Sequence, residues 1–344
     1  MKNLSISNFE PQSKYALKGA HVLIFLGLLV FGLGMLEITN RFLVSRYSIN
    51  ALNFRSFLQK KASIQVLFMG DSHLGSGVGD VPDLPKLFNL SFGGFRYPPM
   101  YYLFKRFRDE MPNLKVLILN LDLHSFGPLP QSSFEPHFFW DQYVDYHEIK
   151  QRTDAWYGSR PFEWTILSKN AGRGAFFRGL QEALKFNRPH KKILSSLRAE
   201  NAEQEWRIAE RPLVQSRRAD SHFVSKNPLE PGVRYFFQKL LELAREKEII
   251  VITVQLPVSR YYFERAKQYV TPAQLMDWID SDLRSYSVKN LDYRELFFDH
   301  QEYFQLDGDH LSSRGREAFL KILFQDLQKT LKTSKIKDVS FPEN

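Results

Sequence analysis

Short apolar runs that alternate with helical patterns constrain the fold of this chain more than any other feature. Three runs of strand length are apolar almost throughout, at Ile64–Met69, Lys115–Asn120 and Ile249–Leu256. Parallel strands that are covered on both faces have this continuous apolar pattern. Shorter runs at Leu87–Leu90 and Val288–Tyr293 complete the expected set of strands.

Apolar residues at helical spacing occupy the intervals between these runs. Pro98-Pro99 begins one helix, because proline is well tolerated in a first turn. Further helices are expected around residues 233–244, 272–283 and 319–327. Strands that alternate with helices predict an α/β fold whose sheet is mainly parallel and has helices on both faces.

Two motifs far apart in the chain contain the residues of a nucleophilic centre. Gly-Asp-Ser-His occupies positions 70–73, just after the first apolar run, and Asp-Gly-Asp-His occupies positions 307–310. A serine becomes a good nucleophile when a histidine accepts its proton, and a carboxylate must orient that histidine. Ser72, His310 and Asp307 are therefore the candidate catalytic residues. The alternatives are a serine that caps a turn and an Asp-Gly loop that binds a cation.

These motifs resemble the first and last blocks of the SGNH/GDSL hydrolase superfamily, a strand ending in Gly-Asp-Ser and a late Asp-x-x-His. The family's second block resembles Asn-Leu-Ser-Phe-Gly-Gly at 89–94, and the blocks occur in the family's order. The resemblance covers roughly residues 65–125 and 249–325. It implies a flavodoxin-like SGNH hydrolase fold, an acyl-serine intermediate, and an oxyanion site formed by the N–H groups of Ser72 and Gly94.

The family's third block, usually Gly-x-Asn-Asp after a strand, is not matched. Leu-Asp-Leu-His at 121–124 follows the third run, and Asn120 still lies within that run. His124 is a candidate replacement for the missing donor, whereas Asp122 would repel an oxyanion. Such departures occur in membrane-anchored relatives that modify cell-envelope polymers, such as the alginate acetylation proteins and the D-alanyl transfer protein of teichoic acid synthesis. The chain looks most similar to that group.

Other polar residues near the motifs have less certain roles. His73, His124 and Asn89 are candidate substrate contacts, although structural histidines are an equal alternative. Asp71 is expected to be a structural hydrogen-bonding residue and Asp309 a solvated side chain, and the glycine pair at 93–94 could form a plain tight turn. No twelve-residue calcium loop with the right ligand spacing is present, so we expect no metal and no cofactor.

The charge and cysteine content narrow the class of partner. The chain has a formal net charge of +9 and no cysteine. The charge fits an anionic polymer or membrane surface. Nucleic acid is the competing interpretation, but no nucleic-acid motif is visible and we expect no such partner. The absence of cysteine excludes disulfides and thiol chemistry, and it is compatible with the cell envelope.

An uncharged apolar segment lies near the N-terminus. Residues 19–36 lack Asp, Glu, Lys and Arg, and a helix of that length covers about 27 Å, enough for a bilayer core. We expect an uncleaved single-pass anchor, with a cleaved signal peptide or a buried helix as alternatives. The expected layout is a cytoplasmic tail (1–18), a transmembrane anchor (19–38), a juxtamembrane linker (39–62), a periplasmic SGNH-like domain (63–333) and a C-terminal tail (334–344).

Residues 125–230 interrupt the alternation of strands and helices. They are rich in aromatic and basic residues, as in Phe138-Phe139-Trp140 and the basic stretch 186–192. We expect an insertion over the site, with residues 198–222 partly disordered because they are highly charged.

The sequence thus predicts a membrane-anchored SGNH-like serine acyltransferase or esterase. It would act on O-acyl groups, chiefly acetyl, of an envelope glycan. The resemblance also implies a membrane-bound O-acyltransferase as a partner. The alternatives are a plain carbohydrate O-acyl esterase and a catalytically weak accessory subunit of such an acyltransferase.

Overall fold

The computed structural model describes residues 21–35, 38–39, 49–79, 86–127, 141–153, 211–223, 228–333, 339 and 341. Its described strands form one parallel sheet in the order β2-β1-β3-β4-β5. The strands are β1 (Val66–Gly70), β2 (Leu87–Ser91), β3 (Val116–Asn120), β4 (Ile250–Gln255) and β5 (Lys289–Asp292). This is the flavodoxin-like strand order, so the predicted parallel α/β sheet is confirmed.

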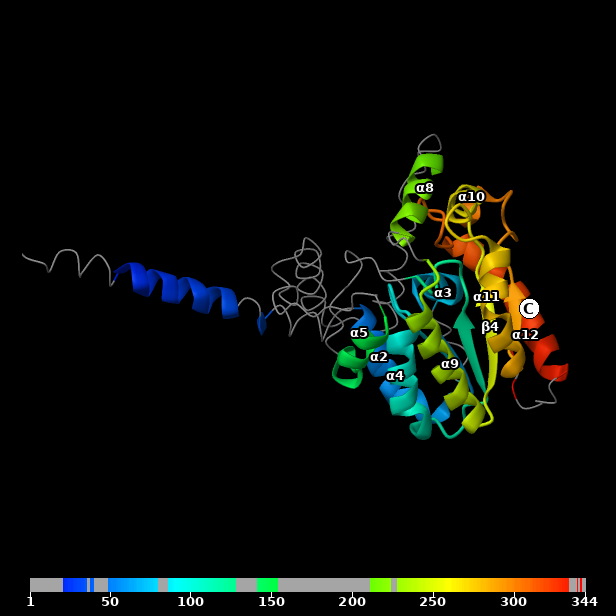
Figure 1. Cartoon of the computed structure of the whole chain (residues 1–344), viewed down its shortest axis with the longest axis horizontal. Coiled ribbons are helices and arrows are strands. Elements are labelled where there is room, and N and C mark those ends of the chain that lie inside the picture. Colours follow the sequence, from blue (N-terminus) through cyan, green and yellow to red (C-terminus); the bar gives the residue numbers. More distant parts are fainter. Residues whose placement is uncertain are drawn as a thin grey trace, which may run out of the picture.

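Helices cover both faces of the sheet (Figure 1). One face carries α2 (Ile49–Lys60), α4 (Tyr97–Phe107), α9 (Pro231–Glu246), α10 (Arg260–Ala266) and α11 (Pro272–Ser285). The other face carries α3 (Ser72–Val78) and α12 (Ser313–Thr333). Besides the helical residues 21–35, the other described helices are α5 (Tyr146–Arg152), α8 (Arg211–His222) and the short 3₁₀ segments η1 (Lys61–Ser63), η2 (Arg108–Glu110), η4 (Asp141–Tyr143) and η8 (Gln301–Tyr303).

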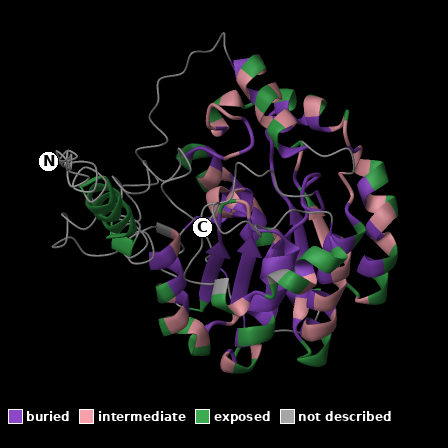
Figure 2. Ribbon diagram, turned by 60° about the vertical axis from the view of Figure 1, so that its left-hand side comes forward, coloured by how far each residue is buried: buried purple, intermediate pink, exposed green. Residues whose placement is uncertain are grey.

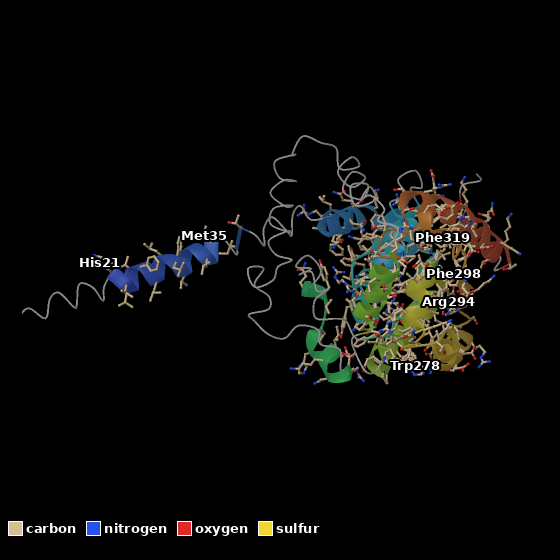
Figure 3. The ribbon with its side chains drawn as sticks, turned by 90° about the horizontal axis from the view of Figure 1, so that it is seen from above. His21, Met35, Trp278, Arg294, Phe298 and Phe319 are labelled. Atoms are coloured by element: carbon tan, nitrogen blue, oxygen red, sulfur yellow. The ribbon has the colours of Figure 1, made fainter. Side chains whose placement is uncertain are left out.

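Two apolar cores lie on opposite faces of the sheet. In β1, Leu67 and Met69 contribute to one core, whereas Val66 and Phe68 contribute to the other. Successive side chains of a strand point to opposite faces, and here both faces are buried. Figure 2 shows the strands as the buried centre of the fold. The fully buried Phe319 of α12, labelled in Figure 3, packs in the second core.

The membrane anchor predicted at 19–38 is not supported by the residues described there, 21–35 and 38–39. Residues 21–35 are helical and their large apolar side chains are exposed. Within the described part of the chain, no helix combines the length and apolar character that crossing a membrane requires.

The expectation of disorder over 198–222 is wrong for its described part. Residues 211–222 form α8, which packs against α10 (Figure 1). The helix buries Arg211, Gln215, Ala219 and His222, which lie about one turn apart on a single face. A buried face of this kind stabilises the helix although most of its residues are charged or polar. The expectation of disorder was based on average charge, which does not show that one face of the helix is buried. The aromatic cluster at 138–140 and the basic stretch at 186–192 lie outside the described residues.

Candidate active site

The polar residues of both motifs gather at the carboxyl edge of the sheet. The strand order reverses between β1 and β3, and ligands bind α/β sheets in the crevice at such a point. Gly70 ends β1 in close contact with its neighbours. A Cβ there would lie 2.6 Å from Asn120 Oδ1 and 2.8 Å from a Leu74 methyl carbon. A side chain at this position would therefore push the following residues out of place.

Ser72 is the first residue of α3, and it is half-buried. The cap of this helix is Asp71, whose Oδ1 accepts the N–H of His73 at 2.9 Å. The alternative that Ser72 itself caps the turn is therefore not observed. Among the described residues, neither the hydroxyl nor the N–H of Ser72 has a hydrogen-bond partner. The serine is held by backbone structure and its hydroxyl remains available for chemistry.

His310 and Asp307 form the predicted pair. His310 Nδ1 lies 2.6 Å from Asp307 Oδ2. The loop that carries them is closed by an antiparallel bridge between Phe304 and Leu311 and turns at Gly308, whose φ is +76°. Among the described residues Nε2 of His310 has no hydrogen-bond partner. Nδ1 is thus oriented by a carboxylate while Nε2 is left to accept a proton.

The two motifs meet through His73, which follows Ser72. The ring centroids of His73 and His310 are 5.5 Å apart. No hydrogen bond between Ser72 and His310 is present in the described structure. Catalytic hydrogen bonds are often long without substrate and shorten in the reactive complex.

A buried network of charged and aromatic side chains lies behind Ser72. Asp71 Oδ2 lies 2.8 Å from His124 Nε2 and 3.1 Å from Arg96 Nη1. His73 lies between two carboxylates, with Nε2 at 3.0 Å from Asp309 Oδ2 and Nδ1 at 3.3 Å from Asp122 Oδ2. This network connects the end of β1 to the end of β3 and to the C-terminal motif.

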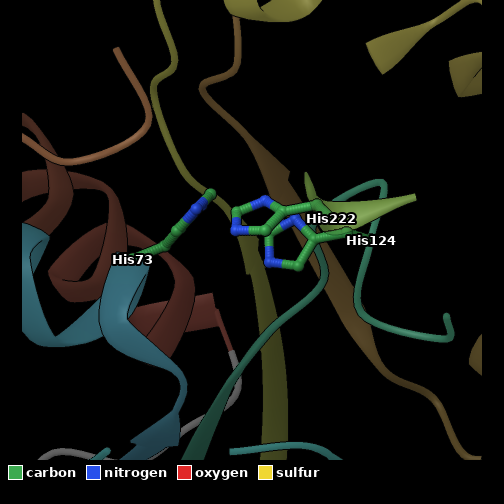
Figure 4. Close-up of side chains that lie close together, drawn as sticks. All are labelled: His73, His124 and His222. Carbon is green, nitrogen blue, oxygen red and sulfur yellow. The ribbon is translucent and has the colours of Figure 1, made fainter. Parts of the chain in front are cut away.

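Helices α8 and α10 also contribute side chains to this network. Arg218 Nε donates to Asp309 Oδ2 at 2.7 Å, and His222 Nδ1 lies 2.6 Å from the hydroxyl of Tyr262. Figure 4 shows His73, His124 and His222 gathered at this point. The ring centroids of His124 and His222 are 4.4 Å apart. A segment between β3 and α9 therefore contributes two side chains to the site.

Burial and neighbouring charges give the histidines different protonation states. Burial lowers the pKa of His73, but Asp71, Asp122 and Asp309 outweigh burial and raise it to about 9. Burial, with Arg96 and His73, lowers the pKa of His124 to about 4. Burial also holds the pKa of His222 well below its ordinary value. At neutral pH His73 is a buried cation beside two neutral imidazoles.

Several of these groups could in principle bind a metal. Donor atoms of His73, His124 and His222 lie within 4.8 Å of one another, as do those of two Asp-containing groups in the same region. However, Arg96, Arg218 and protonated His73 already face the three carboxylates of the network. The network is charge-balanced as it stands, so we assign no metal to it. The sequence-based expectation of no metal and no cofactor stays a prediction.

The structure also shows where the other candidate site residues from the sequence lie. Gly94 lies in the turn after β2 with φ of +70°, and its N–H has no partner among the described residues. Asn89 is buried, and its Nδ2 donates to Gly79 O at 2.9 Å. His73 and His124 are almost completely buried within the network. Roles of these residues in substrate contact or oxyanion binding stay predictions.

Two conclusions from the sequence require correction or addition. Asp309 was expected to be solvated, but only 1% of it is exposed, because its carboxylate pairs with His73 and Arg218. Arg218, His222, Tyr262 and Arg96 were not anticipated. Only the position of Arg96, two residues after the glycine pair, offered any local signal; the others lie far from either motif.

Folding stability is expected to peak near pH 6.5. The raised pKa of His73, about 9, stabilises the fold below its ordinary value of 6.5, and this contribution is lost as pH rises through 9. The lowered pKa of His124, about 4, stabilises the fold above 6.5, and this contribution is lost as pH falls toward 4. His73 and His124 each contribute roughly 3 kcal/mol to their arm, and the raised pKa of His310 and the lowered pKa of His222 add to the alkaline and acid arms respectively. Urea unfolding between pH 4 and pH 9 measures both.

Variants separate the two arms of this profile. His73→Gln should make the alkaline arm shallower and His124→Gln the acid arm, leaving the parts that come from His310 and His222. The exposed His300→Gln serves as the control and should change neither arm. A profile without a maximum between pH 5 and pH 8, or arms as steep in both variants as in the native chain, would refute the assignment.

The chain is similar to three solved structures from bacteria. A candidate acylhydrolase from Bacteroides fragilis aligns with 81% of this chain and 98% of its own, at 16% identity and a TM-score of 0.36. A GDSL-like lipase from Bacteroides thetaiotaomicron aligns over 81% and 98% at 11% identity and the same TM-score of 0.36. A candidate platelet activating factor protein from Streptococcus pneumonia aligns over 88% and 99%, with 13% identity and a TM-score of 0.36.

A scan of protein-family models and a search of curated proteins gave no match. The likeness to the three solved structures is distant, and no residue role is transferred from them. The side chains of this chain alone support the function proposed below.

Proposed function

We propose that this protein is a serine hydrolase or acyltransferase that forms an acyl-Ser72 intermediate. The supporting observation is the Asp307–His310 pair, in which Nδ1 of His310 lies 2.6 Å from the carboxylate and Nε2 is unoccupied among the described residues. This pair lies beside His73, the residue that follows the half-buried Ser72. Such an arrangement suits nucleophilic attack on an ester carbonyl.

In this proposal each residue has a defined task. Asp309 and Asp307 hold the pKa of His310 well above its ordinary value, so the reaction starts from the fraction of the protein in which this ring is neutral. The Oγ atom of Ser72 then attacks the carbonyl carbon of the ester while Nε2 of His310 takes the hydroxyl proton. Asp307 holds the Nδ1–H side of the ring and stabilises the imidazolium that forms. The protonated His310 then gives its proton to the leaving alcohol, and the acyl group remains on Ser72. Water, or a sugar hydroxyl deprotonated by His310, releases the acyl group in the second half.

Two backbone N–H groups are proposed to bind the oxyanion. Those of Ser72 and Gly94 are without partners among the described residues, and backbone donors of this kind contribute about 3 kcal/mol each to transition-state stabilisation. Side chains after β3 are less suitable, because His124 already lies against Asp71 and Asp122 accepts the N–H of Leu256.

The identities of the acyl group and of its acceptor are proposed from the sequence alone. An acetyl group transferred to or from an envelope glycan fits the net charge of +9, which favours an anionic polymer. The alternatives are a plain O-acyl esterase, in which water is the acceptor, and a weakly active accessory subunit of a membrane-bound O-acyltransferase. The unmatched third block supports the latter alternative.

Trapping the acyl-enzyme tests the proposal. The purified full-length chain is mixed with p-nitrophenyl acetate, quenched in acid within seconds, and analysed by intact mass and peptide mapping. We expect one acetyl group on the peptide that contains Ser72, and none on that peptide in Ser72→Ala. An adduct confined to lysines, or released p-nitrophenol with no adduct under any quench time, would argue against the covalent route. No adduct and no turnover would favour the accessory subunit.

Membrane attachment and a periplasmic location also remain proposals from the sequence. The large apolar side chains of residues 22–35 are exposed, and burying them in lipid would be favourable. We expect the full-length chain to stay with membranes after a carbonate wash, and a reporter fused after Asn344 to be active only outside the cytoplasm. Deleting residues 1–40 should release a folded domain. Release of the intact chain by salt alone would contradict attachment through this segment.

A further inference from the structure

Asp309 lies between the candidate base and the buried network. Its Oδ1 is 3.1 Å from His310 Nδ1, and its Oδ2 is 3.0 Å from His73 Nε2 and 2.7 Å from Arg218 Nε. His222 Nε2 lies 3.6 Å from the same Oδ2 atom. Asp309 is therefore a carboxylate shared by a histidine proposed to do chemistry and by the cations His73 and Arg218.

Two carboxylates thus face one nitrogen of His310. Nδ1 carries a single hydrogen and donates it to Asp307 Oδ2, which lies at 2.6 Å, closer than Asp309 Oδ1 at 3.1 Å. Asp309 Oδ1 is left buried without a hydrogen bond, so its effect on the ring is mainly that of a charge. Its side chain is 0% exposed, whereas that of Asp307 is 30% exposed. A charge buried at low dielectric acts more strongly than one screened by water.

Arg218 opposes this charge from a different part of the chain. It belongs to α8, between β3 and α9, and its side chain is 33% exposed. Its guanidinium pairs with Asp309 at the atom that does not face His310. Any change that removes Arg218 leaves more of the Asp309 charge acting on the His310 ring.

We propose that Asp309 is a positioning residue for His310, and that Arg218 of helix α8 sets how strongly Asp309 raises the basicity of that histidine. The catalytic meaning of this inference rests on the proposed function. Helix α8 then belongs to the catalytic apparatus through Arg218.

The charged and titratable groups around His310 and Asp309 come from three elements. Asp307 and Asp309 lie on the loop of His310 and His73 lies on α3, while Arg218 and His222 of α8 contact Asp309. Burial lowers the pKa of His310, but Asp309 and then Asp307 raise it well above its ordinary value. Removing the Asp309 charge should therefore lower this pKa, and removing the Arg218 charge should raise it further.

The test measures the protonation of His310 directly and through activity. Full-length protein labelled with ¹³C at histidine Cε1 is titrated by NMR, and His310 is assigned from the signal missing in His310→Gln. Asp309→Asn should lower the pKa of His310 by about one unit or more, a tenfold change in proton affinity. Arg218→Gln should shift it in the opposite direction. The ascending limb of the pH–kcat profile for p-nitrophenyl acetate should move in the same directions, with KM little changed.

Matched variants separate a charge effect from a structural one. Arg218→Lys restores the cation and should return the limb toward that of the native chain. Arg217→Gln, at the exposed neighbouring position, should change nothing. If Asp309→Asn fails to fold, the Arg218→Gln and Arg218→Lys pair still tests the idea, because Arg218 is partly exposed.

The inference is overturned if the pKa of His310 is unchanged in both variants, or if both shift it the same way. The NMR titration needs no turnover, so its result does not depend on the proposed function. Failure of the proposed function would appear separately, as full activity in Ser72→Ala.

Discussion

Replacing Ser72 with alanine is expected to abolish nearly all ester hydrolysis and to leave the fold intact. Ser72 occupies the first position of α3, and its hydroxyl makes no hydrogen bond among the described residues. Removing it therefore costs little stability, because Asp71 caps the helix. Loss of a nucleophile of this type lowers kcat by a factor on the order of 10³ or more. Hydrolysis of p-nitrophenyl acetate by the full-length chain, with a thermal melt alongside, measures both effects.

Variants at neighbouring positions show whether the loss is specific. Ser76→Ala, on the same short helix, removes a hydroxyl that donates to His73 O at 2.9 Å and should retain most activity. His310→Ala should reduce kcat about as far as Ser72→Ala, and the double variant should lose little more, since residues that act as a unit are not additive. Near-native turnover in Ser72→Ala would rule out an acyl-serine intermediate.

Replacing Asp71 with alanine should destabilise the domain by roughly 3–5 kcal/mol, because it leaves a buried cation uncompensated. Asp71 is 2% exposed and faces Arg96 at 3.1 Å and His124 at 2.8 Å. The same substitution removes the cap of α3, which adds about 1 kcal/mol. Urea unfolding at pH 7, followed by circular dichroism, gives the change in the free energy of unfolding.

The origin of this loss can be tested with a double variant. If an unpaired Arg96 causes most of it, then Asp71→Ala combined with Arg96→Met should be less unstable than the sum of the single changes. Asp71→Asn should be intermediate, since an amide oxygen can still cap the helix but cannot balance the arginine. A loss below about 1 kcal/mol in Asp71→Ala would mean that the pair contributes little net stability.

The sequence alone was sufficient for most of the sheet. Apolar runs predicted β1, β3 and β4 within two residues at each end, because a strand buried on both faces needs apolar side chains at every position. The Asp307–His310 pair was likewise predictable. A spacing of three residues in a loop that its own Phe304–Leu311 bridge closes brings the carboxylate to the ring, but which ring nitrogen it contacts, Nδ1, was not predicted from the sequence.

Tertiary structure alone decided the environment of these residues. His73 and Asp309 are 236 positions apart and Arg218 and Asp309 are 91 apart, so no local pattern indicates that they pair. Asp309 looks like any loop aspartate until the fold brings two cations against it and removes water. The sequence determined which residues could perform chemistry, because reactivity begins with residue type and short spacing. The fold determined their charges and basicity, because burial and distant partners set the pKa of each group.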